Sequence, residues 1–353
     1  LADHSEPIPL PIVGNYPLSD PPIEARDVQT RDGRAYIALS TPDGDTRLVC
    51  VLDVSVPGDP HLMATGYGNS YATDELWLEG DHVYIAKKSR GVEILDVSSP
   101  TSIPPGSTYR PDSYVISKAL HVVGNRLYIA DEFYGLQIVD VTDPASPSLM
   151  GSFGEGTVFG EGVWVDGETA YGAAGRSGVR FIDVSDPYYP FPLKPYAEQV
   201  PWLDHLLPGR AVDVQGENET LYVAAEQAGI SLFDVSDPNI PGDPAAFDTH
   251  FAEKIDVVEG IVYVADGEEG LVVIDATDPT DMHAVGYCDT PGRAYGVSVR
   301  GVHAYVADGE EGLQVIALSD LTPTATATPT QTPLPTATCT PTRGPIVFPL
   351  VMK

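Results

Sequence analysis

Basic residues and cysteines are both scarce in this chain. Its 353 residues include 19 Lys and Arg against 51 Asp and Glu, which gives a net charge of −32. Such a surface repels the phosphates of nucleic acids and anionic lipid headgroups, so we expect neither as a partner. The three cysteines, Cys50, Cys288 and Cys339, have no CxxC spacing. The spacing predicts neither a zinc site nor a disulfide framework, and it leaves the pairing of the three open.

Long apolar segments and catalytic motifs are also missing. No segment approaches the ~18–20 consecutive apolar residues of a membrane-spanning helix. The chain starts at Leu1 without a basic and apolar leader, so we expect the mature form of a secreted protein. HExxH, GxSxG, a P-loop and a GxGxxG after a strand are all absent, and we expect no enzyme, no catalytic residue and no zinc.

One ten-residue segment recurs along the chain. It is clearest at residues 135–144 (GLQIVDVTDP), and similar segments begin at Gly91, Gly178, Gly229 and Gly270. Each is typical of a β-strand that is entered at glycine and ended by Asp, Ser or Thr, and Pro. The tyrosines before these glycines mark seven units, at Tyr36, Tyr84, Tyr128, Tyr171, Tyr222, Tyr263 and Tyr305. Their spacing of 41 to 51 residues suits a four-stranded propeller blade.

Unit six shows the four predicted strands, at residues 255–258, 261–265, 271–275 and 284–287. We therefore expect an all-β protein, a seven-bladed β-propeller of antiparallel blades in residues 1–320. Unit seven has no fourth strand of its own. Residues 11–16 match the fourth strands of other units, so we expect the segment 8–17 to pair with unit seven and close the ring.

The chain resembles the LVIVD-repeat family of seven-bladed β-propellers over about residues 8–320. The resemblance rests on residues 271–275 (LVVID) and their copies, on 304–309 (AYVADG) and on 289–292 (DTPG). It implies this fold and a secreted or surface bacterial protein, but no assigned chemistry.

The composition changes after Asp320. Residues 322–343 hold ten Thr and five Pro, which predicts an extended linker over 321–345. Its threonines are candidate O-glycosylation sites: Thr324, Thr326, Thr328, Thr330, Thr332, Thr336 and Thr338. Asn218 begins an N-glycosylation sequon on a predicted hairpin turn. The chain then ends in an apolar strand, 346–353, whose candidate docking residues are Ile346, Val347, Phe348, Leu350, Val351 and Met352.

Polar and aromatic residues interrupt the predicted inner strands. The candidates for a ligand site in the central channel are Asp27, Trp77, His121, Trp164, Asp213, Asp256 and Ser298. The alternative is that these Asp and His side chains hydrogen-bond neighbouring blades while Trp fills space between them. Acidic turns begin at Asp131, Asp266 and Asp308; they suggest either a Ca²⁺ site or, as we expect, a solvated acidic rim without a cofactor.

Two functions fit this sequence. The first is a secreted structural protein that assembles into a filament or surface layer when residues 346–353 of one copy dock on the propeller of another. The second is a surface-anchored binding module for a glycan, peptide or metal, in which the tail is a sorting or anchoring signal. Both place the protein outside the cell.

Overall fold

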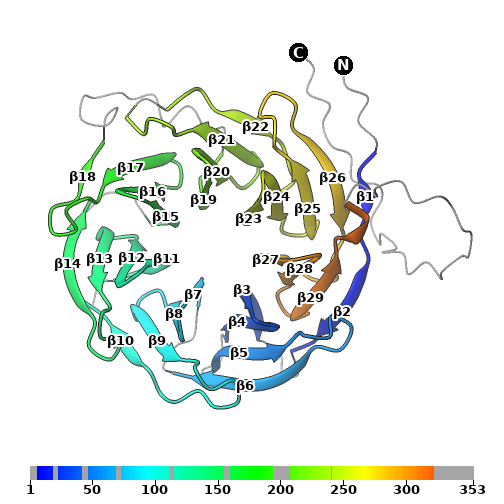
Figure 1. The fold of residues 1–353 in the computed structure, drawn as a ribbon, viewed down its shortest axis with the longest axis horizontal. Helices are drawn as coiled ribbons and strands as arrows, with labels where there is room; N and C mark the ends of the chain where they lie inside the picture. Colours follow the sequence, from blue (N-terminus) through cyan, green and yellow to red (C-terminus); the bar gives the residue numbers. More distant parts are fainter. Residues whose placement is uncertain are drawn as a thin grey trace, which may run out of the picture.

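The computed structural model describes residues 6–18, 23–41, 47–68, 73–111, 115–154, 160–193, 207, 209–239 and 241–321. These residues form seven small sheets, each built on four antiparallel strands and arranged as blades around a central channel (Figure 1). The fold class predicted from the repeats is confirmed. Among the described residues, no helix is long and apolar enough to cross a membrane.

The first four blades follow one another in chain order. Blade one contains β3 (Glu24–Arg31), β4 (Arg34–Ser40), β5 (Arg47–Asp53) and β6 (His61–Tyr67). Blade two contains β7 (Leu76–Glu79), β8 (His82–Ala86), β9 (Val92–Asp96) and β10 (Ser107–Tyr109). Blade three contains β11 (Ser117–Val123), β12 (Arg126–Asp131), β13 (Gly135–Asp140) and β14 (Ser148–Phe153). Blade four contains β15 (Gly162–Asp166), β16 (Thr169–Ala173), β17 (Val179–Asp183) and the two-residue β18 (Phe191–Pro192).

The last three blades include the N-terminal segment. Blade five contains β19 (Asp213–Glu217), β20 (Thr220–Ala224), β21 (Ile230–Asp234) and β22 (Ala245–Phe247). Blade six contains β23 (Lys254–Val258), β24 (Ile261–Ala265), β25 (Leu271–Asp275) and β26 (His283–Cys288). Blade seven contains β27 (Gly296–Arg300), β28 (His303–Ala307) and β29 (Leu313–Ala317), and a 3₁₀ turn, η2 (Ser319–Leu321), follows.

The N-terminal segment contributes strands to two blades. β2 (Ile12–Tyr16) pairs antiparallel with β29 and is the outer strand of blade seven. β1 (Ile8–Pro9) pairs parallel with β26, so it adds a fifth strand to blade six. No repeat or periodic pattern predicts this second pairing. Figure 1 shows both strands beside the last two blades.

The hydrophobic core is divided among the interfaces between blades. Seven clusters of buried side chains each lie between two adjacent sheets, including one between blade seven and blade one. Strands such as β24 and β25 are buried along nearly their whole length because a neighbouring blade covers each face. This two-sided burial explains why their sequences are continuous apolar runs rather than alternating ones.

The glycine and aspartate of the repeat have separate structural roles. Gly135 has a φ of 70°, and a Cβ there would lie 2.3 Å from the backbone oxygen of Phe153 in β14. Only glycine fits this approach between third and fourth strands. Asp140 ends the third strand, and its Oδ1 accepts the backbone N–H of Thr142 at 2.8 Å. This Asx turn stops the strand and starts the loop to the fourth one.

Candidate functional site

The innermost strand of every blade runs along the central channel, and its side chains form two successive rings. The first ring lies opposite alanines of the second strands and consists of Asp27, Glu75, Ala119, Gly162, Asp213, Lys254 and Gly296. The second ring lies opposite the seven repeat tyrosines and consists of Gln29, Trp77, His121, Trp164, Gln215, Asp256 and Ser298. Successive residues of a strand point to opposite faces. On each inner strand, the second-ring residue therefore comes two positions after the first-ring residue.

The side chain of Lys254 extends across the first ring toward Asp27, Glu75 and Asp213, and we call these four residues the plug. Its Nζ lies 2.9 Å from Oδ2 of Asp27 and 2.6 Å from Oε1 of Glu75, which belong to blades one and two. Burial disfavours the charge of Lys254, but Asp27, Glu75 and Asp213 outweigh this and raise its pKa above the ordinary value. Burial raises the pKa of Glu75 to about 8; Lys254 opposes the rise, and the charges of Asp27 and Asp213 add to it.

This arrangement predicts that Glu75 makes the protein less stable as the pH rises. Its pKa is raised from 4.5 to about 8 on folding, so the folded state binds the extra proton between these values and stability falls across that window. Burial also raises the pKa of Asp256 and Asp308 to about 6, so these two groups likewise lower the stability of the folded state as the pH rises. Glu75→Gln should therefore show a smaller drop in urea midpoint between about pH 5 and about pH 8 than the wild type. Glu310→Gln, at an exposed side chain, is the control. An unchanged pH dependence in Glu75→Gln would contradict the assignment.

Most polar members of the rings also hydrogen-bond the next blade. The innermost strand of each blade is the edge of its sheet. The backbone N–H groups on its unpaired side therefore need hydrogen-bond acceptors from outside the sheet. In the first ring, Asp27 Oδ2 accepts the N–H of Leu76 at 2.9 Å, and Glu75 Oε2 accepts that of Leu120 at 2.8 Å. Three further examples are Asp213 with Ile255, Gln29 with Leu78 and Asp256 with Val299. The rings therefore hold neighbouring blades in register.

His121 is buried between the two channel tryptophans. Its ring stacks on Trp164 at 4.3 Å between centroids and meets Trp77 edge to face at 4.3 Å. Burial lowers the pKa of His121 to about 3, so the imidazole is neutral. Its Nδ1 accepts the N–H of Val165 at 2.6 Å, which places the imidazole hydrogen on Nε2. His121 is thus a structural member of an aromatic cluster.

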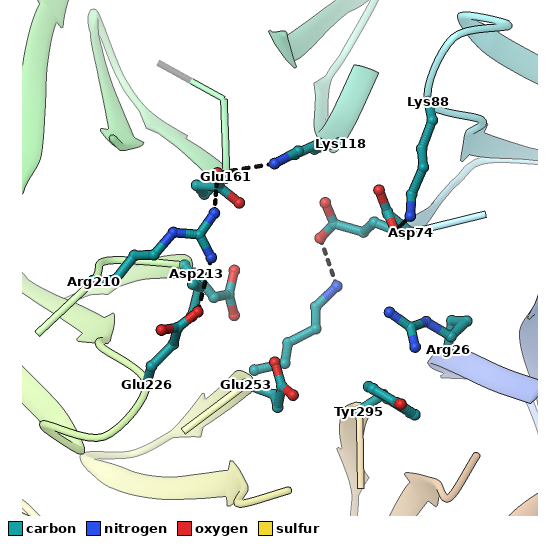
Figure 2. A pocket seen from close by; sticks show the side chains of 13 residues that line it. Arg26, Asp74, Lys88, Lys118, Glu161, Arg210, Asp213, Glu226, Glu253 and Tyr295 are labelled. Atoms are coloured by element: carbon teal, nitrogen blue, oxygen red, sulfur yellow. Dashed lines mark hydrogen bonds and ion pairs between the residues drawn. The ribbon is translucent and has the colours of Figure 1, made fainter. Parts of the chain in front are cut away.

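A pocket of about 250 Å³ opens where the inner strands begin (Figure 2). We call it the mouth pocket. Its cations are Arg26, Lys88, Lys118, Arg210 and Lys254. Its carboxylates are Asp74, Glu75, Glu161, Asp213, Glu226 and Glu253. Two of the cations, Arg26 and Lys118, occupy positions where the pairing register of the inner strand shifts, and such bulges redirect a side chain.

The cations of the mouth pocket are paired to different extents. Arg210 binds both Glu161 and Glu226, and Lys118 lies 2.9 Å from Glu161, as the dashed lines in Figure 2 show. Arg26 instead stacks on the ring of Tyr295, 3.8 Å from its centroid. Of its nitrogens, only Nη1 has a carboxylate partner in the described part of the chain, Glu24 at 3.3 Å. Nε and Nη2 of Arg26 donate no hydrogen bond within the described part of the chain.

A second pocket, of about 290 Å³, occupies the other half of the channel. We call it the distal cavity. Trp77 and Trp164 form one side of its lining, and Gln29, Gln215 and Ser298 contribute from other blades. Glu75, Asp213 and Lys254 border both pockets, so the plug separates them.

The structure places all seven predicted channel residues along the axis, where they divide between the two rings. Asp27 and Asp213 belong to the first ring; Trp77, His121, Trp164, Asp256 and Ser298 belong to the second. Sequence reasoning missed Gln29 and Gln215, although every second-ring residue stands seven positions before its tyrosine. It also missed the lysine of the plug, Lys254, and the mouth cations.

The acidic turns combine buried aspartates with exposed glutamates. Asp131, Asp266 and Asp308 are all buried, whereas Glu132, Glu268 and Glu310 are exposed, so only the glutamates belong to a solvated acidic rim. Asp266, for example, accepts the N–H groups of His250 at 2.9 Å and Phe251 at 2.7 Å, which fixes the entry into blade six. Among the residues that the structure describes, no group of three or more His, Cys, Asp or Glu side chains is placed to hold a metal ion.

Other predicted sites lie partly outside the described residues. Residues 346–353, Cys339 and the candidate threonines, 324–338, all fall there, and their roles stay predictions. Asn218 is exposed in the two-residue turn between β19 and β20. Cys50 and Cys288 are both buried, and neither forms a disulfide with another described residue.

Comparisons with known proteins agree with this architecture. Three solved structures are similar at 8–12% identity, which supports the fold alone. The designed Ika8 protein has a TM-score of 0.58 at 8% identity, with 87% of this chain and 99% of that chain covered. The WD40 β-propeller domain of Doa1 has a TM-score of 0.61 at 10% identity, with 87% and 96% covered. A chain of the mitotic checkpoint complex has a TM-score of 0.63 at 12% identity, with 90% and 94% covered. No curated protein matches the sequence.

The family model for the LVIVD repeat matches five segments, at residues 71–106, 116–154, 160–194, 251–290 and 291–326. Together they cover more than half of the chain and fall on blades two, three, four, six and seven. The chain belongs to the LVIVD-repeat family.

Proposed function

We propose that this propeller is a non-enzymatic binding module, displayed outside the cell, that holds an anionic group of its ligand in the mouth pocket. The observation that carries the proposal is Arg26. Its guanidinium is fixed on Tyr295 and points into the pocket (Figure 2). Two of its nitrogens have donors left for a carboxylate, which arginine binds through two parallel hydrogen bonds.

Charge distribution supports the same reading. The chain carries 19 Lys and Arg in all, and five of them line this one pocket. The protein as a whole has a net charge of −32, yet the pocket holds five cations against six carboxylates. An anionic group therefore meets less repulsion at the mouth than elsewhere on the surface. A carboxylate could come from a peptide chain end or from an acidic sugar.

The proposal predicts that Arg26→Gln weakens carboxylate binding by about 10-fold to 100-fold, because a charged hydrogen bond contributes about 1.5–3 kcal/mol. Calorimetric titration with N-acetylglycine and with glucuronate separates the peptide and sugar sources. The matched control is Arg110→Gln, because Arg110 is exposed and lies outside the pocket lining. Equal affinity in Arg26→Gln, or equal affinity for the uncharged methyl esters, would refute the proposal.

Self-assembly through residues 346–353 is the second candidate. Every strand of the seven described sheets comes from residues 8–317, so no described blade lacks a strand that the C-terminal segment is needed to supply. An apolar segment left over in this way favours docking on another copy. If deletion of 345–353 leaves assembly unchanged in size exclusion and electron microscopy, this candidate fails. Cell fractionation then tests the alternative, in which the tail retains monomers in the envelope.

A further inference from the structure

We infer that the distal cavity is a binding site for a neutral saccharide ring, distinct from the carboxylate site proposed for the mouth pocket. The inference rests on the uneven distribution of side chains around the second ring. Blades two and four supply aromatic groups to the cavity, and blades five, seven and one supply hydrogen-bonding groups. A pyranose ring combines an apolar face of C–H groups with hydroxyl groups at its edge, so it is complementary to such a lining.

The aromatic side consists of Trp77 and Trp164, whose ring centroids are 6.0 Å apart and which meet edge to face. His121 packs against both rings, with centroids 4.3 Å away, and restrains their rotation. A rigid aromatic wall binds a ligand at little cost in conformational entropy. The indole Nε1 atoms of both tryptophans are buried and have no hydrogen-bond partner among the described residues. Because these nitrogens have almost no accessible surface, they face the surrounding protein and not the cavity; a Cβ at Gly216 would lie 2.7 Å from Trp164 Nε1.

The opposite side keeps hydrogen-bonding capacity that the fold does not use. Among the described residues, the Ser298 hydroxyl hydrogen-bonds only the Thr30 hydroxyl, at 3.1 Å, and each group has further donor or acceptor positions. Gln29 uses its Oε1 to accept the N–H of Leu78, which leaves its NH₂ group for other acceptors. Charged side chains also line the cavity, among them Asp256 and Arg300, and a carboxylate accepts hydrogen bonds from sugar hydroxyls.

Size and access also favour one sugar ring. The cavity volume of about 290 Å³ is near the lower limit for small-molecule sites. Its outer end is reached between Val258, which is 39% exposed, and the exposed Arg300. Its inner end is the plug around Lys254, so a ligand enters from the face opposite the mouth pocket.

The chain allows a direct spectroscopic test because it contains only three tryptophans, and two of them line the cavity. In a Trp202→Phe background, the remaining indole N–H signals belong to Trp77 and Trp164. The probes are methyl β-D-glucopyranoside, methyl β-D-galactopyranoside and N-acetylglucosamine, with cyclohexanol as an apolar ring of similar size. We expect at least one sugar to shift both indole N–H signals and to change the tryptophan fluorescence with millimolar saturation, and cyclohexanol to do neither.

Variants locate the site. Ser298→Ala and Thr30→Val should each weaken sugar binding at least 5-fold, whereas Ser146→Ala, at an exposed residue, and Arg26→Gln, in the mouth pocket, should leave it unchanged. The inference is overturned if no sugar shifts the indole signals, or if cyclohexanol binds as well as the sugars. It is also overturned if Arg26→Gln abolishes the response while Ser298→Ala retains it, since the ligand would then occupy the mouth.

Discussion

Lys254→Met should lower the free energy of unfolding by about 3–5 kcal/mol, which is the usual cost of removing one partner from a buried ion pair. The side chain of Lys254 is 18% exposed, and that of Asp27 is 1% exposed. Without the ammonium group, Asp27, Glu75 and Asp213 would face one another in the channel. Methionine has a similar length, so the loss measures charge rather than volume. Urea denaturation at neutral pH gives the value.

Acidification should partly rescue this variant. Glu75, with its pKa of about 8, is largely protonated at neutral pH, so the repulsion comes from the carboxylates of the first ring that remain charged. Protonation removes this repulsion, so the deficit of Lys254→Met relative to wild type should shrink as the pH falls. The control is Lys88→Met, because Lys88 is 43% exposed in its pair with Asp74 and such surface pairs contribute about 0–1 kcal/mol. A deficit as small as that of the control would mean that Lys254 does not hold the first ring together.

Leu10→Ala should destabilise the protein by about 2–5 kcal/mol, the range found when a large side chain is removed from a packed core. Leu10 lies between β1 and β2 and is fully buried in the cluster between blades six and seven. A Cβ at Gly286 would lie 3.0 Å from Leu10 Cδ1, so the leucine packs closely on β26. Thermal and urea denaturation both test the loss.

The companion variant is Val13→Ala. Val13 belongs to β2 but is 39% exposed, so its truncation should cost well under the Leu10 value. If both variants behave alike, the N-terminal segment contributes to stability through backbone pairing alone and not through burial. If neither matters, the joint between the first and last blades is held by the inner strands instead.

Much of the fold could be predicted from the sequence because the blade is a repeated unit. The predicted second and third strands of unit six, 261–265 and 271–275, coincide with β24 and β25. Their continuous apolar runs require cover on both faces of each blade, and a closed ring of blades provides it. β1 was not foreseen, because a two-residue parallel pairing has no periodicity that a sequence could display.

The site was harder to predict for a physical reason. In blades one and five, Asp and Gln alternate as Asp27, Val28, Gln29 and as Asp213, Val214, Gln215, so polarity alone cannot assign a ring. The distance to the repeat tyrosine assigns the ring, because strand pairing fixes the register: a residue seven positions before the tyrosine belongs to the second ring. The plug has no local signal. Lys254 meets carboxylates 179 and 227 residues away only because the ring brings blade six opposite blades one and two.

The position of β29 determines how the propeller would respond to tension. The described part of the chain ends at Leu321, four residues after β29, which lies between β28 and β2. If residues 322–353 fasten the protein to another body, a pull on that tether acts along β29. Two ladders, with β28 and β2, then have to shear together rather than open one bond at a time. The N-terminal strand would therefore act as a mechanical clamp on the C-terminal attachment point.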